Sequence, residues 1–197
     1  MNRRDAIKGT AMVLGFAITG STLSSLLQSC TPEPGLAYTP LLLNDTQAKT
    51  LAAIVDRLLP KTDTPGALEI GVDRFIDKLL ANAFPPDIQE GFAGGIDTFN
   101  QKAKVSHGKD FMKLGPAEQD QVLKTYEENS GPLPGSMWGF SFGEPEEFPF
   151  YRMMKELALI GYFNSEKIGK EYLAYNPIPG PYEGCIGYDT IGKNWAE

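Results

Sequence analysis

The chain has 197 residues, of which 42% are hydrophobic and 22% are charged, so it can form a packed domain and is not disordered throughout. Its net charge at pH 7 is −7, and removal of a segment through Ser29 leaves 15 basic and 24 acidic residues, a net charge of −9. Because an acidic body repels phosphate groups, nucleic acid is a poor partner, and anionic lipid gains no electrostatic attraction to the body.

The first 29 residues have the pattern of an export signal. Arg3 and Arg4 precede an apolar stretch over 11–27 that ends in small residues. The stretch is short, and its second half is too polar for a comfortable transmembrane helix. We therefore predict a signal peptide at 1–29.

Two short runs refine this prediction. The run over 2–8 resembles a twin-arginine (Tat) signal, although Ala6 stands where that pattern usually has Phe. The run over 27–30 resembles a lipobox, in which Cys30 becomes the lipidated first residue of the mature chain. The alternative is an ordinary secretory signal in which the arginine pair and the cysteine have no such role. Since Cys30 falls where the apolar stretch ends, we predict a lipid-anchored protein on the periplasmic side of the bacterial envelope, on the inner or the outer membrane.

A tether is predicted at 30–43, between the lipid and the folded body. Pro32, Pro34 and Gly35 oppose a helix there, and few apolar residues are available for packing.

Residues 44–197 have apolar side chains at helical spacing, which predicts a single compact all-α domain of five to six helices. Asn44 or Asp45 can cap the first helix, and Gly91, Gly94 and Gly95 weaken the third unless they permit close helix contact. The expected helices are one that ends at Pro60, one with an apolar stripe over 72–80, one over 87–104, one that starts at Pro116, one over 148–163 and one over 165–173.

Long loops rich in Pro, Gly and aromatic residues connect the helices. The loop over 129–147 contains Trp138, Phe140 and Phe142, and such aromatic content favours an ordered, functional loop over disorder. Its carboxylates at Glu144, Glu146 and Glu147 are read as a solvated rim.

No known catalytic motif is visible in the sequence. His107 lies in a polar stretch without a second ligand cluster, which favours a solvated histidine over a zinc site or a catalytic triad. No Cys-x-x-Cys-His or Gly-x-Gly-x-x-Gly motif occurs, so we expect no haem, flavin or nicotinamide in this chain. No cation lies near Cys185 in the sequence, which favours a buried or interface cysteine over a reactive thiol.

Two C-terminal runs suggest a family. Residues 150–165 contain K-E-L-x-L-x-G-Y-F-x-S, and residues 175–185 end in P-x-P-G-x-Y-x-G-C. Together with the runs at 54–60, 64–67 and 114–123, they resemble the gluconate 2-dehydrogenase subunit 3 family over residues 41–190.

This resemblance implies a three-part enzyme. A large FAD-containing flavoprotein of the glucose-methanol-choline type would oxidise a sugar or polyol hydroxyl. A cytochrome c subunit with haem c, or another acceptor, would take the electrons. The small subunit would hold no cofactor and would support assembly and export of the flavoprotein.

The function that we expect is therefore that of a non-catalytic accessory subunit. The stiffening prolines at 177, 179 and 181 and the aromatic side chains nearby suit a protein interface, unless the aromatics fold back on the domain's own core. The predicted interface residues are Trp138, Phe140, Phe142, Tyr175, Tyr182 and Cys185. The alternatives are a stand-alone lipoprotein that binds a small ligand such as a sugar near the aromatic loop, and a cofactor-free enzyme.

Overall fold

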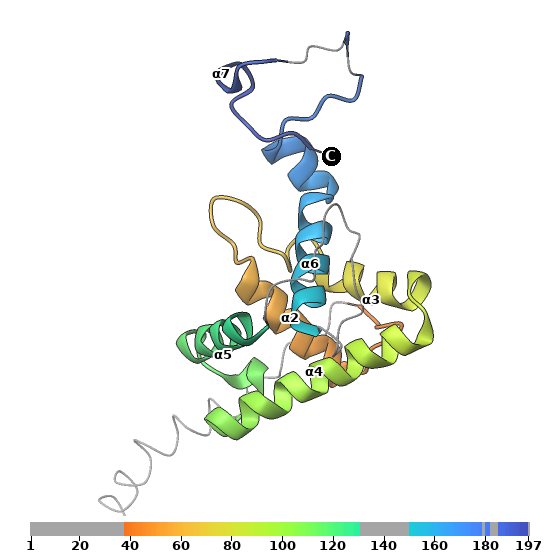
Figure 1. Ribbon diagram of the computed structural model, residues 1–197, viewed down its shortest axis with the longest axis vertical. Helices are drawn as coiled ribbons and strands as arrows, with labels where there is room; N and C mark the ends of the chain where they lie inside the picture. The colour runs from red at the N-terminus through yellow and green to blue at the C-terminus, as the bar shows by residue number, and fades with distance from the viewer. Residues whose placement is uncertain (1–37, 131–149, 179, 182–184, 197) are drawn as a thin grey trace, which may run out of the picture. The chain divides into compact units, whose positions relative to one another are not determined.

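The computed structural model describes residues 38–130, 150–178, 180–181 and 185–196, which form one unit of helices without a β-strand (Figure 1). The all-α prediction is confirmed. No helix in the described part of the chain is both long and apolar enough to span a membrane. The elements are α2 (Asp45–Leu58), α3 (Val72–Ala83), α4 (Pro86–His107), the 3-10 turn η1 (Phe111–Lys113), α5 (Pro116–Asn129), α6 (Phe150–Phe163), the π-helical turn η2 (Ile168–Tyr172) and α7 (Tyr188–Ile191).

The helix boundaries follow from local signals in the sequence. The Asn44 side chain accepts a hydrogen bond from the Gln47 backbone N–H at 2.9 Å, and the Gln47 side chain accepts one from the Asn44 N–H at 3.0 Å, which completes a capping box at the start of α2. Helices α4 and α5 each begin with proline, which needs no hydrogen-bond partner there. Helix α4 runs one turn beyond its predicted end and stops at Gly108, whose φ of 76° suits glycine.

Helix α6 lies at the centre of the packing. It contacts α2, α3 and α4, and Figure 1 shows it upright in the middle of the helices with α4 running across its lower end. The largest fully buried side chains come from nearly every element of the body and include Phe92, Phe99, Phe111, Leu51, Ile76 and Met154.

Two glycines let α6 approach its neighbours closely. A Cβ on Gly161 would lie 2.5 Å from the Phe75 ring of α3, and a Cβ on Gly95 would lie 2.5 Å from the Phe150 ring. Gly94, by contrast, faces open space. The expectation that glycines in α4 permit close helix contact is therefore correct for Gly95 and wrong for Gly94.

The C-terminal tail, residues 174–196, folds back on η2. The Ala174 N–H donates to the Asn194 carbonyl at 2.7 Å, and the Ala196 N–H donates to the Ala174 carbonyl at 2.9 Å, which forms a single parallel β-bridge between Ala174 and Trp195. Figure 1 shows α7 beyond the C-terminal end of α6, away from α2 to α5. The predicted sixth helix is thus a π-helical turn, and neither η1 nor α7 was expected.

Candidate interaction surfaces

The backbone that precedes α2 is held by one buried carboxylate. The side chain of Asp77 on α3 is fully buried and accepts hydrogen bonds from the backbone N–H groups of Leu41 at 2.7 Å, Leu42 at 3.2 Å and Leu43 at 3.0 Å. A buried carboxylate is stable only when several donors bond to it, and these three hydrogen bonds compensate for the cost of burying the Asp77 side chain. The last residues of the predicted tether are therefore fixed to α3.

Tyr38 extends this attachment toward the N-terminus. The Arg74 guanidinium lies 5.9 Å from the centre of the Tyr38 ring, within cation–π range. Burial, with the negative charges of Asp73 and Asp77, raises the pKa of the Tyr38 hydroxyl, so this side chain stays protonated at neutral pH. Burial also raises the pKa of the Asp73 carboxyl. The side chains of α3 thus contact the chain over 38–43.

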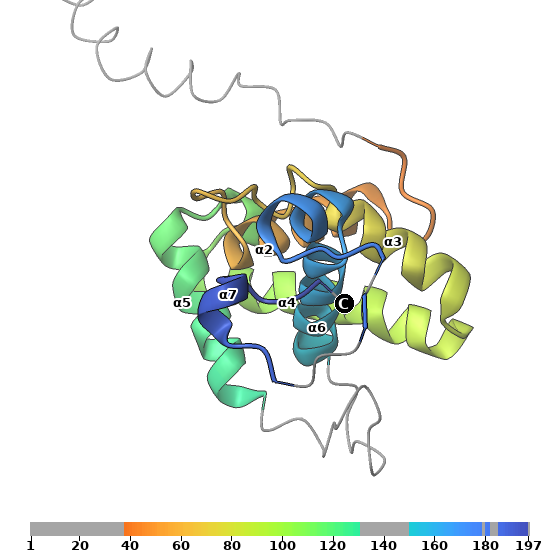
Figure 2. The same ribbon diagram turned by 90° about the horizontal axis from the view of Figure 1, so that it is seen from above.

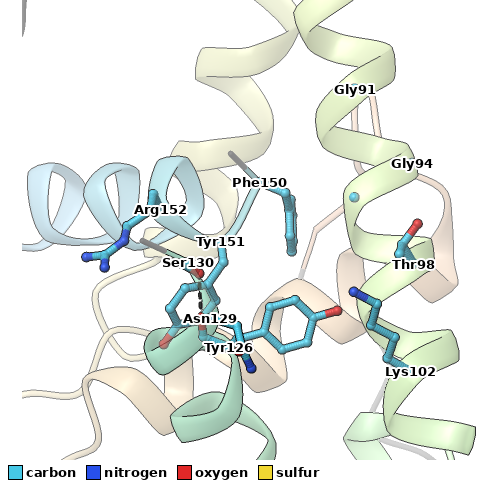
Figure 3. A pocket seen from close by; sticks show the side chains of 11 residues that line it. Gly91, Gly94, Thr98, Lys102, Tyr126, Asn129, Ser130, Phe150, Tyr151 and Arg152 are labelled. Carbon is cyan, nitrogen blue, oxygen red and sulfur yellow. Dashed lines mark hydrogen bonds between the residues drawn. The ribbon is translucent and has the colours of Figure 1, made fainter. Parts of the chain in front are cut away.

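A groove lies between α4, the end of α5 and the start of α6 (Figure 3). It has a volume of about 510 Å³, and Gly91 and Gly94 leave the backbone of α4 bare along one wall. The Tyr126 hydroxyl is buried and has no hydrogen-bond partner among the described residues, and burial raises its pKa. Lys102 places its ammonium group 5.3 Å from the centre of the Tyr126 ring.

Charged groups beside the groove join α5 to α6. The Glu127 carboxylate accepts a hydrogen bond from Lys155 Nζ at 2.8 Å and lies 3.4 Å from Arg152 Nη1. Burial, and then the charge of Glu127, raises the pKa of Tyr151 to about 12. Tyr151 therefore stays protonated at neutral pH, and this group of residues positions two helices rather than moving protons.

Large apolar side chains are exposed around the end of α6 and along the tail. Among the described residues eleven such side chains are exposed, and eight of them fall within 159–195 (Figure 2 gives a second view of this end of the chain). We call these eight the C-terminal surface: Leu159, Ile160, Phe163, Tyr175, Ile178, Ile186, Tyr188 and Trp195. A concentration of this kind is typical of an interaction site.

Two of the predicted interface residues lie in the described part of the chain. Tyr175 is 52% exposed, and Cys185 is exposed with a free thiol, so this thiol is not part of the described core. The other predicted site residues lie outside the described residues: Arg3, Arg4, Cys30, Trp138, Phe140, Phe142 and Tyr182.

His107 and the loop glutamates are the remaining residues of the sequence that could bind a metal ion or transfer protons. His107 is half-buried in the last turn of α4, and the loop glutamates at 144, 146 and 147 are outside the described residues. Within the described ranges, no three His, Cys, Asp or Glu side chains are grouped so that they could hold a metal ion.

Two features of these surfaces were not predicted from the sequence: the burial of Asp77 and the exposed apolar side chains of α6. Asp73 and Asp77 are four residues apart and border the apolar stripe of α3, and this spacing was the available signal for a buried acid. The predicted helix over 148–163 is rich in apolar residues, more than one buried face of a helix requires, and such residues are expected to be covered by another surface. In this chain Ile160 and Phe163 are left uncovered.

The described residues form an all-α unit whose C-terminal part exposes several large apolar side chains. The family described as gluconate 2-dehydrogenase subunit 3 matches residues 45–180. The chain therefore belongs to this family, as its sequence runs suggested, and membership implies association with the other subunits of a gluconate dehydrogenase complex. Comparisons with curated proteins and with solved structures gave no match.

Proposed function

We propose that this chain is the non-catalytic small subunit of an FAD-dependent gluconate or sugar dehydrogenase of the glucose-methanol-choline type, and that it supports the assembly, Tat-dependent export and membrane attachment of the large flavoprotein. The observation that carries the proposal is the family match over 45–180, which begins shortly after a Tat-like signal and a lipobox. FAD belongs to the large subunit, haem c to a cytochrome subunit where one is present, and no cofactor to this chain.

The combination of signal and body supports an escort role. The Tat route, as generally understood, carries folded proteins, commonly those that acquire a cofactor in the cytoplasm. This chain has a Tat-like run at Arg3 and Arg4 but no cofactor motif in its sequence. A partner that holds the cofactor and is exported with this chain explains why the two features occur together.

The Asp77 contact supports a role in membrane attachment. Eleven peptide units separate Cys30 from Leu41, the first backbone N–H that donates to Asp77. A chain of this length spans at most about 40 Å. A lipid on Cys30 would therefore hold the helical body, and any subunit bound to it, close to the membrane.

Purification of the native protein from membranes in mild detergent tests the proposal. We expect a large flavoprotein to co-purify in stoichiometric amount, identified by mass spectrometry and by its flavin absorbance. We expect sugar-dependent dye reduction by the complex and none by the isolated chain. Stoichiometric flavin and dye reduction in the isolated chain would contradict the proposal. A chain that purifies alone and binds a sugar would instead support the stand-alone lipoprotein.

Two N-terminal changes test export and attachment separately. The double change Arg3→Lys with Arg4→Lys should leave the precursor and its flavoprotein in the cytoplasm, and export through the general secretory route would contradict the Tat assignment. The change Cys30→Ala should abolish fatty-acid labelling, which unchanged labelling would contradict. Cys185→Ala is the matched control, because it removes the second cysteine and should leave labelling intact.

A further inference from the structure

We infer that the C-terminal surface is the docking site for the large flavoprotein subunit, and that a side chain of that subunit enters the cleft lined by Phe163 and Tyr175. This inference rests on the proposed function, which supplies the partner. It differs from the interface expected from sequence because it includes exposed residues of α6, among them Phe163.

The first observation is the degree of exposure. Phe163 is 48% exposed, Tyr175 52% and Trp195 49%, although three phenylalanines of the body, Phe92, Phe99 and Phe111, are completely buried. No residue of α7 is buried. Since exposed large apolar side chains concentrated in one segment are typical of interaction sites, this surface is expected to be covered in the working protein.

The second observation is a cleft in which helix and tail meet. It has a volume of about 240 Å³ and is lined by Phe163 at the end of α6 and by Tyr175 and Ala196 of the tail. Glu166 and Lys170 also line this cleft, and Lys170 Nζ donates to Glu166 Oε1 at 2.7 Å. Because these two charges already pair with each other, a partner that covers the cleft meets aromatic rings beside paired polar groups, a mixture found at protein interfaces.

The third observation is that the tail is held in place before binding. The bridge between Ala174 and Trp195 joins the two ends of the tail, and Lys193 Nζ donates to the Glu171 carbonyl at 3.2 Å. Gly192, with φ of 67°, ends α7. A surface whose backbone is already ordered loses less conformational entropy on binding, so the aromatic side chains can contribute more to affinity.

The charge of this region favours protein over lipid as the occupant. Residues 159–197 carry five acidic and three basic side chains, a net charge of −2. A region with this charge has no excess of cations to attract anionic lipid. Tyr and Trp at the centre of an apolar surface are the side chains that most often anchor protein interfaces. Family membership implies that another subunit is available to cover it.

The test compares single charges placed inside and outside the surface. Phe163→Asp in the full chain, co-expressed with the flavoprotein, should weaken the complex at least tenfold, because a charge would be buried against an apolar partner. Val105→Asp is the matched control: Val105 lies on α4, outside the surface, and is 77% exposed. It should leave affinity unchanged. Tyr175→Asp provides a second variant should Phe163→Asp lower the melting temperature of the isolated chain.

The readouts are the dissociation constant of the complex and the melting temperature of each isolated variant. Wild-type affinity in a folded Phe163→Asp or Tyr175→Asp variant would overturn the inference and leave the proposed function standing. Loss of self-association, measured by sedimentation, with the flavoprotein still bound would assign the surface to a second copy and would also overturn it. If the variants lost only their binding to anionic vesicles, the surface would be assigned to lipid, and this result would also overturn the inference. Failure of the wild-type chain to bind any flavoprotein would refute the proposed function itself.

Discussion

Large apolar side chains are mostly buried in the helical body of this chain and mostly exposed in its C-terminal tail. In the body, Phe99 is fully buried and its ring lies 4.9 Å from that of Phe111 and 4.7 Å from that of Tyr126, measured between ring centres. In the tail, Tyr188 and Trp195 are exposed and make no ring contacts of this kind within the described residues. The body is therefore stabilised by contacts among its own side chains, whereas these aromatic side chains of the tail are not packed in the core of the chain.

This difference separates two roles for apolar residues that look alike in a sequence. Residues buried in the body contribute to the free energy of unfolding of the isolated chain. Residues exposed in the tail should contribute to binding instead, because their contacts form only with a partner. Single substitutions can distinguish the two contributions.

The largest expected effect comes from truncating the centre of the aromatic core. Phe99→Ala should lower the free energy of unfolding by about 3–5 kcal/mol, since it leaves a cavity among three rings. Trp195→Ala, the matched change in the tail, should lower it by less than about 1 kcal/mol. Urea denaturation of both variants provides the measurement. Equal losses would mean that the tail belongs to the cooperative core.

The attachment of residues 41–43 to α3 should show the next largest effect. Asp77→Asn removes the charge that accepts three backbone N–H groups and should cost about 1–3 kcal/mol of unfolding free energy. Asp63→Asn, at an exposed loop position, is the control and should change stability by less than about 0.5 kcal/mol. Unaltered stability of Asp77→Asn in the denaturation curve would show that residues 41–43 are not held by this carboxylate.

Two glycine substitutions test how closely the helices of the body pack. Gly161→Ala places a Cβ 2.5 Å from the Phe75 ring and should destabilise by about 1–3 kcal/mol. Gly94→Ala meets no atom within 4 Å and should stabilise by up to about 1 kcal/mol, because alanine is the better helix former. Thermal unfolding gives the sign of each change. Stabilisation by Gly161→Ala would argue against the close approach of α3 and α6.

The smallest effect is expected at the α5–α6 ion pairs. The hydrogen bond from Lys155 lowers the pKa of the Glu127 carboxyl below its unfolded value. Its stabilisation is therefore present above the unfolded pKa and is lost as the pH falls through the folded pKa. Glu127→Gln should cost less than about 1 kcal/mol at pH 7, because the pair is partly exposed. The difference from wild type should vanish in acid, and a difference that persists at pH 2 would contradict this origin.

Much of the body could be predicted from the sequence because its signals are local. Asn44 marks the start of α2, Pro116 that of α5, and the repeat of apolar residues marks the buried face of each helix. Burial of Asp77 could not be predicted with the same ease, since its donors come from residues more than thirty positions away. The different surroundings of Gly94 and Gly95 likewise depend on where α6 lies.

The interaction surface was predictable only in part. The aromatic composition of the tail pointed to Tyr175, but Phe163 was read simply as part of an apolar helix. The chain that follows Phe163 turns at η2, and its ends are joined by the bridge between Ala174 and Trp195. Such contacts between distant segments leave no periodic pattern in a sequence.

Hydrogen–deuterium exchange of the isolated chain and of the complex tests the central claim most directly. In the isolated chain, the amides of α2 to α6 should be protected, and so should the bonded tail amides of Thr190, Gly192 and Ala196, whereas the unbonded tail amides should exchange faster. In the complex with the flavoprotein, protection should rise around Phe163, Tyr175 and Trp195, and exchange near Val105 should stay unchanged. Equal exchange of the tail in both samples, with new protection elsewhere on the body, would contradict the assignment of the C-terminal surface to the partner.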